Sequence, residues 1–195
     1  MERREREVLG EDSMERAIAR ITHEILERNQ GTKDVVLIGI RTGGVYLADR
    51  IREKIRQLEG AEVPMGVIDI ALYRDDFAMA LPRPRVGKTE IPFPLKDRKV
   101  ILVDDVLFTG RTVRAAMDAL IDFGRPKFIQ LGVLVDRGHR ELPIQADYVG
   151  KRITTVPQEE VTVRFRELDG EDRVVIQDAA PKAPPSAPRK ARGPK

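Results

Sequence analysis

A short apolar run followed at once by two aspartates constrains this chain more than any other feature. Val100 to Val103 contains no polar residue and is rich in β-branched side chains, which is typical of a parallel strand buried on both faces. Asp104 and Asp105 stand at its end, where the side chains of an open α/β sheet face a ligand crevice. Because burial of an unpaired carboxylate is costly, we expect both to lie at the mouth of the sheet and to meet sugar hydroxyls or a divalent cation.

A turn rich in glycine and hydroxyl groups follows the two acids. Thr109 and Thr112 supply hydroxyls, Gly110 lets the backbone approach a ligand, and the next segment predicts a helix that Gly124 ends. Free N–H groups and the positive dipole at a helix N-terminus favour a phosphate. The spacing therefore fits a ribose 5-phosphate, with its hydroxyls on the acids and its phosphate in the turn. Receiver domains and metal-dependent phosphatases also carry Asp-Asp at a strand end, so the pair alone leaves those classes open.

A second strand–turn–helix unit precedes the first. Val35 to Ile40 predicts a buried strand, which leads through Arg41-Thr42-Gly43-Gly44 into a helical pattern that stops at Gly60. A glycine turn that carries an arginine and opens a helix can bind an anion. Ordinary strand-to-helix turns share this pattern, so on its own it does not decide between the two.

The N-terminal part predicts a helix from about Ser13 to Asn29. Asp12 is expected to cap this helix, with Glu15 completing a capping box. Arg20 and His23 share a second face of the helix, away from its apolar stripe. A solvated helix surface explains these cations as readily as a binding surface does.

A long connection follows the next predicted strand, Val63 to Leu72. Tyr73 to Pro94 contains more than twenty residues and several prolines. Loops of this length in a compact domain are often lids over a site. A solvent-exposed loop laced with ion pairs fits the composition equally well.

The C-terminal third predicts further strands and then a tail. Lys127 to Val135 fits a buried strand, whereas Val161 to Phe165 and Val174 to Ile176 fit an antiparallel pair around the turn Asp169-Gly170. Residues 179–195 are rich in proline, alanine, lysine and arginine and have nothing to bury, so we expect them to be disordered.

Composition narrows the class of protein. The 195 residues suit one α/β domain, and the chain has no cysteine, which fits a reducing compartment. No apolar run approaches the roughly 20 residues of a membrane span, and the charged N-terminus does not resemble a secretory signal. We expect a cytoplasmic protein without a membrane partner. The net charge of +3 comes from the tail: without its five basic residues, 30 basic side chains face 32 acidic ones.

The motifs together resemble a known family. Val100 to Thr112 resembles the 5-phosphoribosyl-1-pyrophosphate (PRPP) motif of type I phosphoribosyltransferases. The strings Ile68 to Asp76, Val135 to Ile144 and Ala146 to Lys151 look like those of the bifunctional regulators of pyrimidine-operon attenuation that are also uracil phosphoribosyltransferases. The resemblance covers roughly Asp12 to Ile176.

This resemblance implies an α/β protein with the type I phosphoribosyltransferase fold. That fold has a central, mostly parallel sheet flanked by helices, with a small hood and a mobile flap. The implied phosphoribosyltransferase-like domain spans residues 1–178, with a hood from about 137 to 178 plus the N-terminal segment, and the basic tail follows it. The flap corresponds to the long connection after Leu72.

The resemblance also implies an enzyme that converts uracil and PRPP, with Mg²⁺, into UMP and diphosphate. Asp104 and Asp105 would hold the ribose hydroxyls, and Arg74 would meet the pyrophosphate. The 5-phosphate would lie against Phe108, Thr109, Gly110, Arg111 and Thr112, and the pyrophosphate against Arg41, Thr42, Gly43 and Gly44. Val135 and Arg137 would read the uracil edge. The substrate's own oxygens would hold most of the Mg²⁺, so no direct metal ligand is assigned.

The second implied activity is regulatory. A homodimer or higher homo-oligomer would bind a hairpin in the leader of a pyrimidine-operon mRNA when UMP or UTP is abundant. The residues that match the family's basic RNA surface are Arg20, His23, Arg28, Arg140, Lys151 and Thr155. Gln145 stands where an arginine is common, and Ala19 where a hydroxyl residue is common. The alternatives are a plain phosphoribosyltransferase for uracil or another base, and a regulator that keeps the site only as a sensor.

Overall fold

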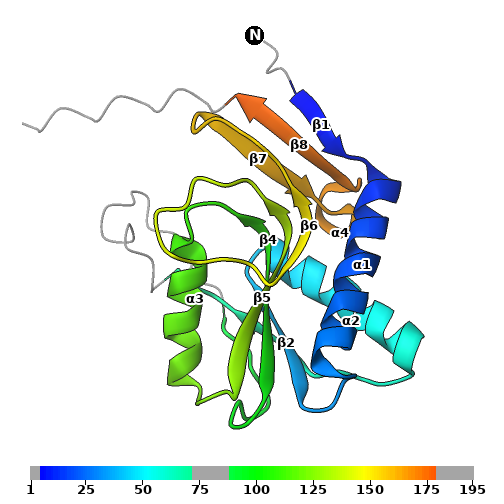
Figure 1. Cartoon of the computed structure of the whole chain (residues 1–195), viewed down its shortest axis with the longest axis vertical. Coiled ribbons are helices and arrows are strands. Elements are labelled where there is room, and N and C mark those ends of the chain that lie inside the picture. The colour runs from blue at the N-terminus through cyan, green and yellow to red at the C-terminus, as the bar shows by residue number, and fades with distance from the viewer. Residues whose placement is uncertain (1–4, 72–87, 179–195) are drawn as a thin grey trace, which may run out of the picture.

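The computed structural model describes residues 5–71 and 88–178, which form two sheets and their covering helices (Figure 1). The predicted tail and most of the predicted flap, including Arg74, lie outside the described residues.

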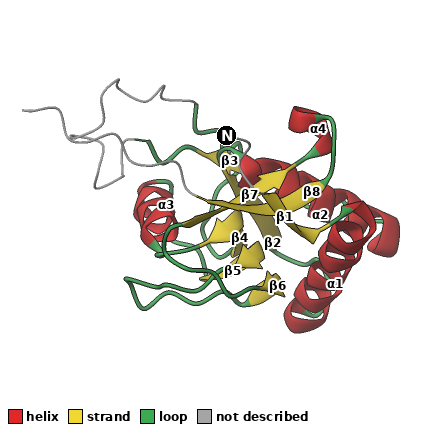
Figure 2. Ribbon diagram, turned by 90° about the horizontal axis from the view of Figure 1, so that it is seen from above, coloured by secondary structure: helices red, strands yellow, loops and turns green. Residues whose placement is uncertain are grey.

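The larger sheet has five parallel strands in the order β3-β2-β4-β5-β6. Its strands are β2 (Val35–Ile40), β3 (Met65–Ile68), β4 (Lys99–Leu107), β5 (Phe128–Asp136) and β6 (Tyr148–Arg152). The helices α1 (Glu11–Asn29) and α2 (Gly43–Glu59) cover one face, and α3 (Arg111–Asp122) covers the other (Figure 2). The predicted central parallel sheet flanked by helices is confirmed.

Burial on both faces explains the uninterrupted apolar strands. In β4, Ile101 and Val103 belong to the core shared with α1 and α2, whereas Val100 and Leu102 belong to the core shared with α3. Successive side chains of a strand point to opposite faces, so a strand between two helical layers needs apolar residues at every position. The same alternation between the two cores explains the apolar residues of β2.

The smaller sheet is the hood, an antiparallel sheet in the order β1-β8-β7. It consists of β1 (Glu5–Leu9), β7 (Glu159–Arg164) and β8 (Arg173–Asp178), and Figure 1 shows it above the end of the larger sheet. Ion pairs fasten β1 to the other two strands, with 2.6 Å between Arg164 Nη2 and Glu5 Oε1 and 2.9 Å between Arg173 Nε and Glu7 Oε2. β6 lies within the range predicted for the hood but forms the edge of the larger sheet.

Several local predictions need correction. Helix α1 begins at Glu11 after Gly10, and no side chain caps it, so Asp12 is not its N-cap. The reason is that β1 runs almost directly into the helix, where the Gly10 carbonyl accepts the first helical hydrogen bonds. The strand predicted from residue 63 to residue 72 is only β3. The predicted antiparallel pair is confirmed, but a short helix, α4 (Arg166–Asp169), replaces a tight turn before Gly170.

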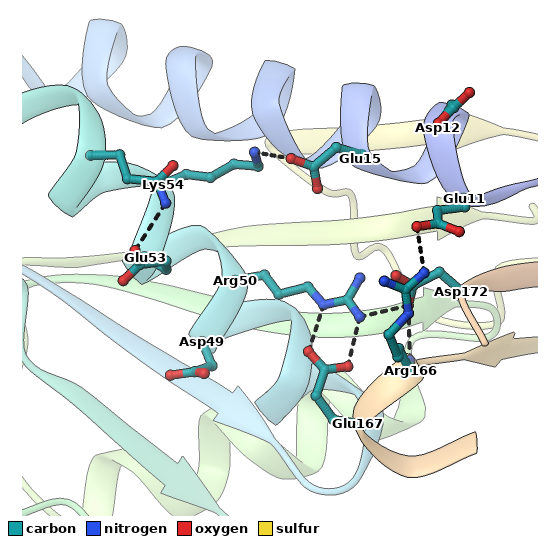
Figure 3. Close-up of a pocket in the computed structure, with 11 residues that line it drawn as sticks. Glu11, Asp12, Glu15, Asp49, Arg50, Glu53, Lys54, Arg166, Glu167 and Asp172 are labelled. Carbon is teal, nitrogen blue, oxygen red and sulfur yellow. Dashed lines mark hydrogen bonds and ion pairs between the residues drawn. The ribbon is translucent and has the colours of Figure 1, made fainter. Parts of the chain in front are cut away.

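Arg50 of α2 anchors the hood to the rest of the molecule. Its guanidinium makes two hydrogen bonds to Glu167, of 2.9 and 2.6 Å, and one of 2.6 Å to Asp172. It also lies 5.2 Å from the ring centroid of Phe165, which is buried in the core. These charges line a cavity of about 540 Å³ between α1, α2 and the hood, where Arg166–Glu11 and Lys54–Glu15 pairs add further links (Figure 3).

We expect Arg50→Met to lower the free energy of unfolding by about 2 kcal/mol, because it leaves two carboxylates of the hood without their cation. Urea unfolding measures this loss. The matched control is Arg52→Met, two positions along the same helix, which removes an exposed pair with Asp49 and should change stability by less than about 0.5 kcal/mol. Equal losses in the two variants would show that the hood is anchored elsewhere.

Candidate active site

The two acids lie within β4 rather than beyond its end. The strand continues to Leu107 because β5 still pairs with it there, Asp104 opposite Val133. On its other side, β2 pairs with β4 only as far as Gly39 and Val103. The prediction that the acids end the strand is therefore wrong for the edge that pairs with β5. On the edge that pairs with β2, the acids follow directly after the last paired residue, Val103.

Burial and mutual repulsion shape the electrostatics of this pair. Asp104 is only 5% exposed. Burial, and then the charge of Asp105, raises the pKa of Asp104 well above its ordinary value, and burial also raises the pKa of Asp105. Backbone N–H groups donate to one oxygen of each: Asp105 N to Asp104 Oδ1 at 3.0 Å and Val106 N to Asp105 Oδ1 at 2.9 Å. Within the described residues neither carboxylate has an ion-pair partner, which makes the pair a candidate ligand site.

The predicted pyrophosphate loop packs directly on the acidic pair. A Cβ at Gly43 would lie 2.2 Å from Asp105 Oδ2, and one at Gly44 would lie 2.3 Å from the carbonyl oxygen of Val103. Only glycine permits this approach. Arg41 donates a 3.0 Å hydrogen bond to the Lys88 carbonyl, which places it beside the start of the second described range.

The two helices that open at this site are both uncapped. Thr42 precedes α2 and Gly110 precedes α3, and neither N-cap residue bonds to its helix through a side chain. At α3 the Arg111 N–H donates a long hydrogen bond of 3.4 Å to Thr109 Oγ1. Neither helix carries an acidic residue in its first turn. Gly110 has a φ of 92°, a left-handed conformation that glycine adopts without strain. Two helix N-termini with free donors beside a pair of acids can hold two phosphates and the sugar between them.

The two residues predicted to read uracil are both buried but have different surroundings. Val135 has no exposed surface and belongs to the core. The Arg137 guanidinium lies 4.0 Å from the ring centroid of Phe108 and donates to Thr155 Oγ1 at 3.2 Å and to the Val156 carbonyl at 3.1 Å. Burial lowers the pKa of Arg137. The structure thus brings Arg137 to the predicted 5-phosphate loop at Phe108, whereas Val135 lies in the core.

The six predicted RNA-binding residues separate into two groups. Arg20, His23 and Arg28 on α1 and Lys151 on β6 are exposed, and these two elements lie side by side. Arg20 also donates to the carbonyls of Val149 and Gly150 at the edge of the sheet. The other two are enclosed.

The enclosed residues of that set are Thr155 and Arg140. Thr155 is 6% exposed, and its hydroxyl contacts Arg137. Arg140 is half-buried among backbone carbonyls behind the phosphate loop. Asp136 and Glu141, which contact this loop region, received no role from the sequence. The sequence signal that could have identified these two acids is their position on either side of the basic Arg140.

The fold is that of a phosphoribosyltransferase. A family model described as the phosphoribosyl transferase domain matches residues 6–168. Among solved structures, hypoxanthine phosphoribosyltransferase of Trypanosoma cruzi is similar with a TM-score of 0.69 at 18% identity, covering 91% of this chain and 93% of that one. A hypoxanthine-guanine phosphoribosyltransferase of Bacillus anthracis is similar with a TM-score of 0.64 at 18% identity, over 91% and 99%. At such low identity these two structures support the fold alone.

Curated relatives give the finer assignment. Proteins named "Bifunctional protein PyrR" are 56% identical in Pelotomaculum thermopropionicum, over 92% of this chain and 99% of the relative, and 58% identical in Chloroflexus aurantiacus, over 88% and 94%. The chain belongs to the phosphoribosyl transferase domain family and, within it, to the family of bifunctional PyrR proteins. Among the helices in the two described ranges, none is both long and apolar enough to cross a bilayer.

Proposed function

We propose that this protein is a UMP- or UTP-responsive, RNA-binding regulator of pyrimidine-operon attenuation that also converts uracil and PRPP into UMP and diphosphate. The observation that carries this proposal is the identity of 56% and more to bifunctional PyrR proteins over nearly the whole chain. The acidic pair between two uncapped helices supports the enzymatic half.

Catalysis on this site is positioning and charge stabilisation. As pyrophosphate leaves, C1′ of the ribose gains oxocarbenium character, and the base nitrogen attacks from the opposite face. No protein nucleophile is required. Asp104 and Asp105 hold the ribose hydroxyls, the N-terminus of α3 holds the 5-phosphate, and the N-terminus of α2 with Arg41 holds the leaving group. Arg74 is proposed to meet the pyrophosphate, and Arg137 to border the base.

The donor set of the site fits Mg²⁺. Asp104 and Asp105 offer the hard oxygens that this ion prefers, and they are the uncompensated acids beside the phosphate loops. No group of three or more acidic or histidine side chains able to hold a metal occurs among residues 5–71 and 88–178. We propose that the oxygens of PRPP hold most of the ion, beside the two carboxylates and with no direct protein ligand assigned. When bound, Mg²⁺ neutralises charge that develops on the departing pyrophosphate.

The exposed cations on α1 and β6 are the proposed RNA surface. His23 is exposed on α1, and Lys151 and Arg152 are consecutive exposed residues at the end of β6. Phosphates and unstacked loop bases of an RNA hairpin suit such side chains. We propose that the surface works in a homodimer in the cytoplasm, where two copies present it together.

Binding to a pyrimidine-leader hairpin, with and without UMP, tests the proposal. We expect specific binding at near-physiological salt that UMP tightens, together with turnover of uracil and PRPP. Weak binding that ignores both sequence and UMP would leave a plain phosphoribosyltransferase, with Gln145 and Ala19 the first positions to restore to the arginine and hydroxyl residues common in the family.

We expect Lys151→Gln to weaken binding of the hairpin about tenfold and to make it less dependent on salt, because one phosphate contact is lost. Turnover of uracil should change less than twofold, since Lys151 lies on the exposed end of β6. Filter binding across a salt series and a steady-state assay measure the two effects. A parallel loss of both would place this surface within the active site.

A further inference from the structure

Arg140 ties the 5-phosphate loop to the segment that follows β5. Its Nη1 donates to the Phe108 carbonyl at 2.7 Å and to the Gly138 carbonyl at 3.0 Å. Its Nε donates to the Ile144 carbonyl at 3.0 Å. Its Nη2 donates to Asp136 Oδ1 at 2.6 Å, an ion pair at the end of β5. A guanidinium has five N–H groups, and these four bonds use four of them.

The rest of the segment from Gly138 to Ile144 reinforces the same contact. The Thr109 carbonyl accepts hydrogen bonds from the backbone N–H groups of Glu141, at 3.0 Å, and Leu142, at 3.2 Å. Arg111 Nε donates to Glu141 Oε2 at 2.7 Å. The segment therefore contacts the loop through Thr109 and Arg111, the residues on either side of Gly110.

We infer that Arg140 is a positioning residue of the 5-phosphate site rather than an RNA contact. This inference rests on the proposed function, which supplies both the phosphate ligand and the RNA. Arg140 has a side chain only 22% exposed, and its donors point at carbonyls of its own chain. By fixing the Phe108 carbonyl it sets the direction of the backbone that leads to the donors at the start of α3. The binding energy of the phosphate then depends on a side chain that does not touch it.

Lysine in place of Arg140 separates the two roles. A direct contact with an RNA phosphate needs a positive charge, which lysine supplies as a point charge. Holding three carbonyls and a carboxylate in fixed directions needs the planar fork of arginine, which lysine lacks. The charge is thus kept while the geometry is lost.

For Arg140→Lys we expect the KM and the calorimetric Kd for PRPP with Mg²⁺ to rise about tenfold, as after loss of one hydrogen bond that involves a charged group. The KM for uracil and the affinity for the RNA hairpin without nucleotide should change less than twofold. Wild-type PRPP affinity in Arg140→Lys would overturn the inference. So would a loss of nucleotide-free RNA binding in Arg140→Met that Arg140→Lys restores.

A milder variant covers the case in which Arg140 substitutions fail to fold. Glu141→Gln removes one exposed ion pair to the loop, and we expect the Kd for PRPP to rise about threefold. Asp118→Asn is its matched control, since it removes an exposed pair with Arg114 on α3 that does not reach the loop. Equal PRPP affinities in the two would contradict the inference. The PRPP measurement tests the role of Arg140 even if the protein does not bind RNA. Failure of the regulatory proposal would therefore be detected separately, in the RNA-binding assay.

Discussion

Asp104→Asn is expected to lower kcat/KM for PRPP by about 100-fold or more while it makes the unliganded protein more stable at neutral pH. The loss of activity follows because the proposed contact of this buried carboxylate with the ribose hydroxyls depends on a charge that an amide cannot provide. The gain in stability follows from burial: Asp104 is 5% exposed, and its carboxylate has no cation partner within the described residues.

The dependence on pH distinguishes this explanation from a simple structural change. The pKa of Asp104 is raised in the folded protein, so the folded state holds its proton more tightly than the unfolded chain does. The wild-type protein therefore loses stability as the pH rises above about 4, the ordinary value for aspartate, and through the raised pKa. The asparagine variant cannot ionise, so its advantage should be absent near pH 4 and present at pH 7.5.

Thermal unfolding at the two pH values, combined with steady-state kinetics, measures these effects. Asp118→Asn serves as the control, because Asp118 is exposed on α3 and should show neither the loss of activity nor the gain in stability. An Asp104→Asn protein that is less stable at both pH values would show that the carboxylate is mainly a structural hydrogen-bond acceptor. A fully active variant would remove Asp104 from the catalytic site.

The sequence predicted those parts of the fold whose information is local. Strands such as Val35–Ile40 and the apolar stripes of α1 and α2 are legible because buried elements repeat their apolar residues at the period of the element. β1 was missed because its residues are mostly charged, and only pairing with β8, far along the chain, makes them a strand. A strand that forms only by pairing with a distant segment cannot be predicted reliably from its own residues.

The candidate site shows the same division. The acids and the glycine turns were found because their residue types are needed next to one another in the chain. Arg140 was assigned to the RNA surface because its position matches one on the basic surface of the family that the sequence resembles. Its partners are mainly the carbonyls of Phe108, Gly138 and Ile144, and every residue has a carbonyl, so no sequence pattern could identify them. The burial of Thr155 likewise depends on Arg137, which β5 places beside it.

Gly44→Ala is the second variant for which we expect a large effect. Alanine is the better helix former, so at a position in the first turn of α2 it should stabilise the helix slightly. Its Cβ would however lie 2.3 Å from the Val103 carbonyl oxygen and 3.0 Å from Asp104 Cα, both part of the β4 backbone. Since β4 is paired on both sides at Val103, the loop must move instead. We expect a loss of about 2–3 kcal/mol in stability and about 100-fold in kcat/KM.

Gly132→Ala in β5 is the control for this variant, because the nearest atoms to its Cβ would be 3.9 Å away, an ordinary contact. Urea unfolding and the PRPP assay should show that Gly132→Ala is close to the wild-type protein and Gly44→Ala is not. The comparison of the two variants tests whether the close approach of Gly44 to β4 is needed for stability and activity. If Gly44→Ala lost stability but bound PRPP normally, the α2 N-terminus would not hold the pyrophosphate, and the leaving group would have to be stabilised by other residues. If it lost PRPP binding more than stability, the close approach of this loop to the acids is what makes the site.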